Sequence, residues 1–447
     1  TCGAETTIPG PMFLMLLLAP TALSDSPACR PERDAPIPRI SKAQNTAAFW
    51  LNRLSDLERN QVLLPPSVVS DLNRHLIAEK ATPDDVLAAP RSTLSDRRAK
   101  GQLRIDRFLT GIAEGIFLPA PDALAEASAR LKSLVKVDEL RAVHTGIDLR
   151  CIPTALPVYK IPVDTEFDRN QCSGLYLGEV VRVLGRSKDG WLYVSAGHSS
   201  GWVAGGGLTP PLSLQEARTF LTSPDRVVLV RDDGPWRLGA SFPAASKSHG
   251  EPHLIAPTPA GLAKVAPPSP QSLVRGVPEL TRARAFEAAF SLVGAPYGWG
   301  DVHGYRDCSR YTHDIAAIFG IRLGRNSVMQ SLAGSDVVEV DGLSDVDKRA
   351  RIVTAGRRGL VLLYMVGHIM LYVGEIDGEP YAISAISEIA EPCAPEAPDG
   401  PRERILQTGR VTASDLEIGR GTSRRAFIER ITRLVVFATP EGLPTLF

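Results

Sequence analysis

Residues 295–309 read APYGWGDVHGYRDCS, and this stretch determines how the rest of the chain is interpreted. Apolar residues follow Cys308 at helical spacing until Gly320, which is a natural helix end. Asp307 is a good N-cap, so we expect Cys308 at the first position of this helix. The positive end of the helix dipole there favours a thiolate over a thiol. The stretch therefore predicts a nucleophilic cysteine, although a free cysteine is more commonly an inert core residue.

A histidine further along the chain supplies a candidate base. His368 begins an apolar, strand-like run, and Asp377 and Gly378 predict a tight hairpin turn into a second strand over residues 380–386. A cysteine and a histidine far apart in sequence are typical of a thiol nucleophile and its base, because the fold brings them together. A helix packed on this sheet would do so. The alternative is an ordinary core histidine.

Four pieces of this sequence resemble, in order, the NlpC superfamily of papain-like bacterial cell-wall cysteine peptidases. They are residues 295–300, 307–309, 325–327 with Gln330, and 367–374. The resemblance implies a γ-D-glutamyl–diamino-acid endopeptidase that cuts the stem peptides of peptidoglycan after D-glutamate.

The resemblance also implies roles for single residues. Cys308 would be the nucleophile, His368 the base, and Tyr297 would stabilise the oxyanion through its hydroxyl. The D-glutamyl portion of the substrate would be held by polar side chains in the matching pieces: Asp307, Ser309, Ser327 and, in the same set, Arg325.

Two positions depart from the family pattern. Arg310 stands where the family usually has glycine, which is expected to alter the first helical turn and narrow the groove. The third catalytic group is usually a histidine, asparagine or glutamine on the strand after the base, and Ser384 falls at that place. A serine hydroxyl can orient an imidazole but cannot stabilise an imidazolium as an anion could. Two alternatives therefore stay open: a catalytically impaired peptidoglycan-binding protein, and an amide or acyl transferase that uses the same thiol.

Composition narrows the class of protein. The chain has 447 residues, enough for two to four domains, with 50 basic and 50 acidic side chains. This balance offers no bulk attraction for nucleic acid. The sequence contains no phosphate-binding loop and no cysteine pairs at zinc spacing. We therefore expect no nucleic acid, no metal and no cofactor.

The N-terminal 30 residues resemble an export leader. A short apolar block over residues 12–19 precedes the small-residue stretch 26–28, and Cys29 follows directly. We expect an exported protein, periplasmic or associated with the cell envelope, in which a lipid anchor at Cys29 is possible. In an exported protein Cys151 and Cys172 could form a disulfide.

Changes of pattern divide the chain into an α+β multidomain protein. A leader over 1–30 precedes a helical region over 31–143. Two small SH3-like β-barrels follow, predicted by short strands and by the resemblance of tracts 168–171, 178–184 and 201–203 to the bacterial module that accompanies these peptidases. The ranges of the remaining parts are 144–210 for the first barrel, 211–277 for the second, and 278–447 for the papain-like α+β catalytic domain.

The first barrel is expected to close one end of the substrate groove, as in relatives with this domain order. A free N-terminal amine of a short peptide would then find a carboxylate on the barrel, for which Asp168 and Glu166 are the candidates. Trp191 and Trp202 could bind a ligand, but in a small barrel they are at least as often core residues.

Overall fold

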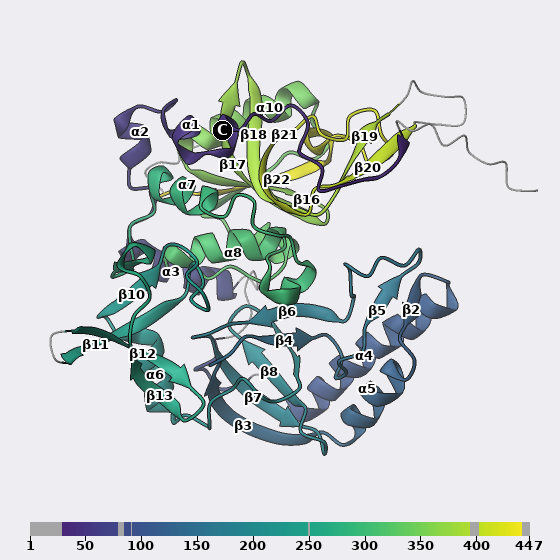
Figure 1. Cartoon of the computed structure of the whole chain (residues 1–447), viewed down its shortest axis with the longest axis vertical. Coiled ribbons are helices and arrows are strands. Elements are labelled where there is room, and N and C mark those ends of the chain that lie inside the picture. The colour runs from purple at the N-terminus through teal and green to yellow at the C-terminus, as the bar shows by residue number, and fades with distance from the viewer. Residues whose placement is uncertain (1–28, 79–84, 91, 249–250, 394–401, 440–447) are drawn as a thin grey trace, which may run out of the picture.

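The computed structural model describes residues 29–78, 85–90, 92–248, 251–393 and 402–439 (Figure 1). The predicted apolar leader lies outside these residues. None of the helices in the described part is long and apolar enough to cross a membrane.

The C-terminal part of the chain is built on a six-stranded antiparallel sheet in the order β15-β22-β16-β17-β18-β21. Its strands are apolar on both faces because helices cover both: α7 and α8 pack on one face, and α10 packs on the other. The strands are β15 (Asp336–Glu339), β16 (Leu360–Met365), β17 (His368–Ile376), β18 (Glu379–Ile386), β21 (Arg410–Asp415) and β22 (Ile431–Phe437). The helices are α7 (Arg282–Phe290), α8 (Cys308–Ile318), α9 (Ser327–Gln330), α10 (Asp345–Arg358) and α11 (Phe427–Arg430), with the short turn η4 (Trp299–Gly304) before α8.

The turn between β17 and β18 sets the register of the candidate site. Asp377 and Gly378 both have positive φ, as the predicted tight hairpin requires. The hairpin pairs Leu371 with Ile383 across the two strands. The predicted strand over 380–386 is thereby confirmed, and Ser384 lies beside the start of β17.

The N-terminal region is not a single helical domain. Helices α1 (Ala47–Leu51), α2 (Asp56–Asn60) and α3 (Pro66–Ala78) lie on the catalytic part, whose core includes Trp50, Leu64 and Leu76. Helices α4 (Leu94–Ala113) and α5 (Ala123–Lys132) pack on the first barrel instead, together with the short pair β2 (Phe117–Pro119) and β5 (Val158–Lys160). The predicted unit over 31–143 is wrong because helical periodicity identifies an apolar face but not its partner.

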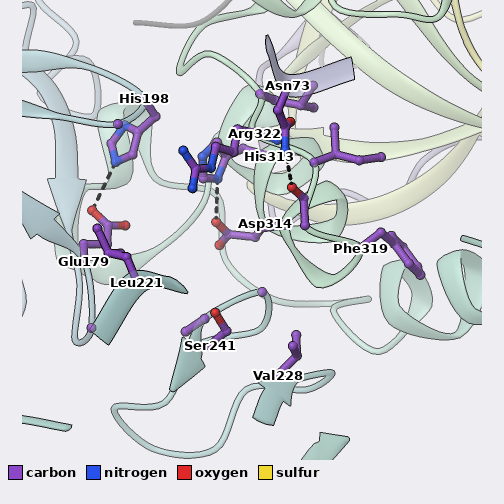
Figure 2. A pocket seen from close by; sticks show the side chains of 18 of the residues that line it. Asn73, Glu179, His198, Leu221, Val228, Ser241, His313, Asp314, Phe319 and Arg322 are labelled. Atoms are coloured by element: carbon purple, nitrogen blue, oxygen red, sulfur yellow. Dashed lines mark hydrogen bonds and ion pairs between the residues drawn. The ribbon is translucent and has the colours of Figure 1, made fainter. Parts of the chain in front are cut away.

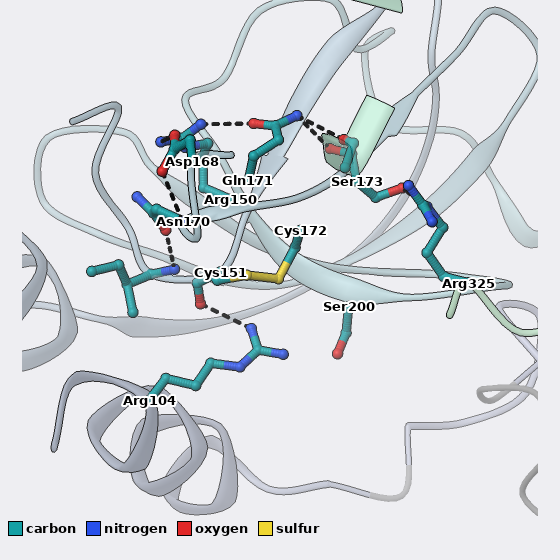
Figure 3. Close-up of a disulfide and its surroundings, with 12 residues drawn as sticks. Arg104, Arg150, Cys151, Asp168, Asn170, Gln171, Cys172, Ser173, Ser200 and Arg325 are labelled. Atoms are coloured by element: carbon teal, nitrogen blue, oxygen red, sulfur yellow. Dashed lines mark hydrogen bonds and ion pairs between the residues drawn. A yellow bond between two sulfur atoms is a disulfide. The ribbon is translucent and has the colours of Figure 1, made fainter. Parts of the chain in front are cut away.

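The first barrel begins earlier than predicted. β3 (Val135–Ala142) lies in the range expected to be helical, yet it pairs with β7 (Val180–Arg186). The sheet has the order β3-β7-β8-β9-β4-β6, with β4 (Ile147–Arg150), β6 (Gln171–Leu175), β8 (Leu192–Ala196) and β9 (Ser200–Val203). Trp191 and Trp202 are buried in its core beside Tyr193, so they are not exposed ligand-binding residues. Cys151 and Cys172 form the predicted disulfide (Figure 3).

A second β unit follows, with the strand order β13-β12-β11-β10-β14. Helix α6 (Leu214–Thr222) precedes it and packs through Phe220 against Phe242. The strands are β10 (Arg226–Leu229), β11 (Ser241–Ser248), β12 (Glu251–Thr258), β13 (Gly261–Val265) and β14 (Leu273–Arg275), with η3 (Pro270–Ser272) before the last. The proline-rich stretch over residues 266–280 has the composition of a linker, but β14 lies inside it, so part of the stretch is sheet.

A second disulfide joins the first described residue, Cys29, to the C-terminal part of the chain. Cys29 is bonded to Cys393, and nearby β1 (Glu32–Arg33) pairs with β20 (Glu403–Gln407), which also pairs with β19 (Ile389–Pro392). The sulfur of Cys29 is therefore occupied and cannot carry a lipid thioether. The structure thus contradicts the possible lipid anchor at this residue.

Helix α8 lies between the catalytic sheet and the two β units (Figure 1), where buried ion pairs join them. The guanidinium of Arg310 donates to Asp314 of the same helix at 2.7 Å and to Glu179 of the first barrel at 2.6 Å. Arg306 in turn bridges Asp314 and Asp232 of the second β unit. These pairs surround a cavity of about 460 Å³ in which Glu179, His198, His313 and Asp314 meet (Figure 2).

We expect Arg310→Gln to lower the free energy of unfolding by roughly 3–5 kcal/mol, because it leaves Glu179 and Asp314 buried without their main cation. The Arg310 guanidinium holds the pKa of Glu179 down at about 2, so this carboxylate stays ionised across the usual pH range. The measurement is chemical denaturation at pH 7 of the parent and the variant.

A double variant, Arg310→Gln with Glu179→Gln, provides the control. Because the double variant also removes the charge of Glu179, it should recover part of the free energy of unfolding that Arg310→Gln loses. Additive effects of the two substitutions would show that the ion pair does not couple the barrel to α8.

Candidate active site

The cysteine of the decisive stretch lies where the sequence predicts it. α8 begins at Cys308, and the side chain of its N-cap, Asp307, accepts a hydrogen bond from the backbone N–H of Arg310 at 2.8 Å. Cys308 is 7% exposed, and the backbone N–H of Ile369 points at its sulfur. Because Ile369 follows His368 directly, α8 and β17 bring the two predicted residues to the same place.

The ionisation of the thiol differs from the prediction. Burial, together with the neighbouring Asp307 carboxylate, raises the pKa of Cys308 to about 12. The helix terminus is a weaker influence, since its dipole is opposed by the very carboxylate that caps it. The expected resting thiolate is therefore wrong, and Cys308 is a neutral thiol at pH 7.

The imidazole of His368 contacts Ser384. Its Nε2 lies 3.0 Å from the Oγ of Ser384, which is fully buried in β18. Burial and, to a smaller extent, the charge of Arg430 lower the pKa of His368 to about 4, against the opposite effect of Asp307. Among the described contacts there is no hydrogen bond between this ring and the thiol of Cys308, so Nδ1 is left to accept a proton. Ser384 lies behind the histidine as predicted, and its role stays a prediction.

Tyr297 is the next polar group beside the thiol. Burial raises the pKa of its phenol well above the usual value, and the charges of Asp307 and Cys308 raise it further. The hydroxyl is therefore protonated at pH 7, and it makes no hydrogen bond with another described residue. It is free to donate to a developing negative charge, as the oxyanion role would require.

Most of the side chains expected to hold the substrate make hydrogen bonds and ion pairs with other side chains of the protein. The guanidinium of Arg325 donates to Asp307 at 2.9 Å and to Asp301 at 2.7 Å. Ser309 donates to Asp307 and accepts from Arg325. Asp307, Ser309 and Arg325 therefore support the start of α8, and Ser327, at the first position of α9, keeps its place in the cavity lining.

Sequence reasoning missed Asp301. This fully buried carboxylate also accepts hydrogen bonds from Ser173 and from the backbone of Gly174 in the first barrel. Arg325 also contacts the first barrel, because its guanidinium donates to the hydroxyl of Ser173 at 2.7 Å. The only sequence signal was the position of Asp301 directly after the aromatic, glycine-rich tract. The network fixes the barrel against the start of α8.

The thiol opens onto a cavity of about 880 Å³ between the catalytic part, the first barrel and α4. Cys308, Ser327 and Tyr297 line it from one side, and the disulfide of the barrel lines it from another (Figure 3). Residues of the barrel therefore line part of this cavity, and closure of one end of the groove by the barrel stays a prediction. Arg310 does not line this cavity because its side chain points to Glu179, so the predicted narrowing of the groove is wrong.

The two carboxylates expected to bind a peptide amine do not face this cavity. Asp168 accepts hydrogen bonds from Arg150 at 2.6 Å and from the backbone of Val158 and Asn170. Glu166 is exposed and is not part of the lining. The predicted amine site is therefore wrong. From the same loop it is Arg169 that lines the cavity.

Comparison with solved structures identifies the fold. An NlpC/P60 endopeptidase from Photobacterium damselae subsp. piscicida matches with a TM-score of 0.70 at 15% identity, over 91% of this chain and 99% of that chain. An NlpC/P60 family protein from Bacillus cereus ATCC 10987 covers 67% of this chain and 99% of its own, with a TM-score of 0.43 at 17% identity. Residues 157–204 match the SH3 domain (SH3b1 type). No curated protein matches the sequence. The chain has the fold of an NlpC/P60 endopeptidase with a bacterial SH3 domain.

The lowered pKa of His368 predicts activity in mild acid. A base with a pKa of about 4 stays unprotonated at pH 5.5, where an ordinary histidine is mostly protonated. We therefore expect kcat/KM for a peptide substrate to keep more than half of its maximum at pH 5.5. The measurement is a pH–rate profile, with circular dichroism at each pH as the control for folding. An acid limb with its midpoint at or above 6.5 would contradict the neutral, desolvated imidazole.

Proposed function

We propose that the protein is a cysteine endopeptidase that hydrolyses the γ-D-glutamyl–diamino acid bond of peptidoglycan stem peptides. The observation that supports it is the thiol of Cys308 at the start of α8, open to a large cavity and beside the His368–Ser384 pair. The fold shared with NlpC/P60 endopeptidases and the SH3b1-type domain are consistent with a substrate in the cell wall.

The pKa values favour general-base catalysis from a neutral pair. Nδ1 of His368 takes the thiol proton as the sulfur of Cys308 bonds to the scissile carbonyl carbon. The carbonyl oxygen becomes an oxyanion, which the Tyr297 hydroxyl and the free N–H groups of the first turn of α8 stabilise. The C–N bond then breaks, and the imidazolium returns the proton to the leaving amine. Water attacks the thioester in the same way and releases the acid.

The two disulfides support the proposed location. Cys29–Cys393 and Cys151–Cys172 would persist only in an oxidising compartment. We therefore place the protein outside the cytoplasm, in the periplasm or at the cell envelope.

Two alternatives predict different products from the same assay. A catalytically impaired binding protein would retain stem peptides without cleaving them, which the weak third group Ser384 favours. A transferase would pass the acyl group of the thioester to an added amine instead of to water. Mass spectrometry of the products from a defined stem peptide, with and without an amine acceptor, distinguishes hydrolysis from both.

Cys308→Ala should abolish hydrolysis of stem peptides and leave the fold intact, because the described part of the chain contains no other free cysteine. His368→Ala should lower kcat nearly as far, since the two side chains act as a unit. The assay is product mass spectrometry, with thermal unfolding of each variant as the control. Cleavage at the parent rate by Cys308→Ala would rule out the mechanism.

Ser384→Ala should lower kcat about tenfold with little change in KM, because it removes the hydrogen bond that orients the imidazole but no substrate contact. Ser384→Asn, which restores a polar partner, should recover part of this loss. If neither substitution changes kcat, another group orients His368.

A further inference from the structure

The cavity that contains Cys308 is lined by several cations without a carboxylate partner. Lining arginines that have such a partner are Arg325, bound to Asp301 and Asp307, and Arg182, bound to Asp138. Four other lining cations make no ion pair with any described residue: Arg97, Lys100, Arg104 and Arg169. Three of them come from α4 and one from the first barrel.

The hydrogen bonds of these four cations are made to neutral groups. Arg97 and Arg104 donate to backbone carbonyls, and Lys100 donates to the hydroxyl of Ser200. Arg104 reaches the carbonyl of Cys151 beside the barrel disulfide (Figure 3). Burial lowers the pKa of Arg97, Arg104 and Arg169. Carboxylates that do not pair with them act in the opposite direction: Asp138 and Asp96 on Arg97, and Asp164 on Arg169.

Arg169 is the member that acts on Tyr297, the tyrosine beside the thiol. Its guanidinium lies over the ring of Trp299, 4.3 Å from the centroid, and its Nε has no hydrogen-bond partner. The charge of Arg169 lowers the pKa of Tyr297, and Cys308 acts on the pKa of the same phenol in the opposite direction. The phenol of Tyr297 therefore lies near both residues. The stacked guanidinium is held rigidly and keeps donors free, which is a good arrangement for binding an anion.

The acidic residues of the cavity lining, Asp85, Asp96 and Asp307, offset only part of this charge. The Asp307 carboxylate is taken up by Arg325, and Asp96 caps α4 through its contacts with Thr93. Asp85 accepts from the backbone of Leu87. A peptide that enters this space therefore meets uncompensated positive charge.

The position of the base indicates which part of a substrate lies near Arg169. His368 must protonate the leaving amine, and its ring lies 5.7 Å from that of Phe427 in α11. The acyl part of the substrate, with its N-terminal group, extends from Cys308 away from the base. Tyr297, Trp299 and Arg169 line the same cavity as Cys308, so an acyl part that enters this cavity meets them.

We propose that Arg169, with Lys100 and Arg104 behind it, makes the enzyme selective for peptides whose N-terminal group is anionic or neutral rather than a free ammonium. The inference rests on the proposed function and names its substrate class: stem peptides that are acylated at the N-terminus. A free ammonium in this space would meet like charge, whereas a carboxylate would gain charge-assisted hydrogen bonds.

The test is a charge series on one stem peptide: free amine, N-acetyl and N-succinyl. We expect kcat/KM to rise in that order, with about tenfold or more between the first and the last, as one charge-assisted contact implies. Arg169→Gln should reduce this ratio to about threefold or less, and Arg169→Lys should keep the order. A preference for the free amine, or an unchanged ratio in Arg169→Gln, would overturn the inference.

Arg182→Gln is the matched control, since it removes a lining cation that Asp138 already compensates. It should leave the charge preference unchanged, and a loss equal to that of Arg169→Gln would overturn the special role of Arg169.

If the parent protein cleaves none of the three peptides, the proposed function fails, and binding decides the inference. Isothermal titration of the same three peptides into Cys308→Ala should then give affinities in the same order. In the double variant Cys308→Ala with Arg169→Gln, the differences in affinity among the three peptides should become smaller. Equal affinities, or no binding at all, would overturn the inference.

Discussion

The candidate site depends on one buried ion pair network, in which the guanidinium of Arg325 bridges the carboxylates of Asp301 and Asp307. The same guanidinium donates to Ser173, so the network joins the first barrel to the start of α8. A buried charge without its partner would cost several kcal/mol, which makes this arrangement an all-or-none feature of the fold. The barrel is therefore a structural part of the cavity wall rather than a separate module.

The network also determines the chemistry that the thiol can carry out. Asp307 remains charged within it and, together with burial, keeps Cys308 protonated, while burial keeps His368 neutral. A preformed thiolate–imidazolium pair is thus disfavoured in the free protein. In the proposed mechanism, proton transfer from Cys308 to His368 would therefore accompany attack on the substrate carbonyl.

Local sequence signals predicted local structure well. The N-cap at Asp307 and the turn at Asp377 and Gly378 follow from short-range rules of capping and hairpin geometry, and both are found. The position of Ser384 beside His368, which the family resemblance implied, is also found. What depends on distant partners was not predictable. Helix α1, through Trp50, packs on the catalytic core, whereas α4 packs on the barrel. The apolar periodicity of the two segments is similar and does not distinguish these partners.

The same reason explains the errors in the predicted site. Asp168 was expected to meet a substrate, but it is bound to Arg150 and lies outside the cavity lining. Asp307 and Arg325 pair with each other and also line the cavity, so their contact with a substrate stays a prediction. The bond between Cys29 and Cys393 spans 364 residues, and no spacing rule could identify it. The pKa of Cys308 depends on its burial, which a helix start alone does not reveal.

The most direct test of nucleophilic catalysis by Cys308 is to trap the acyl group on the enzyme. A stem peptide is mixed with the protein, the reaction is quenched in acid at a series of short times, and the digested protein is mapped by mass spectrometry. We expect a transient thioester of the D-glutamyl fragment on the peptide that contains Cys308, at the same times at which the diamino acid is released. Release of the diamino acid while Cys308 remains unmodified at every time would contradict it.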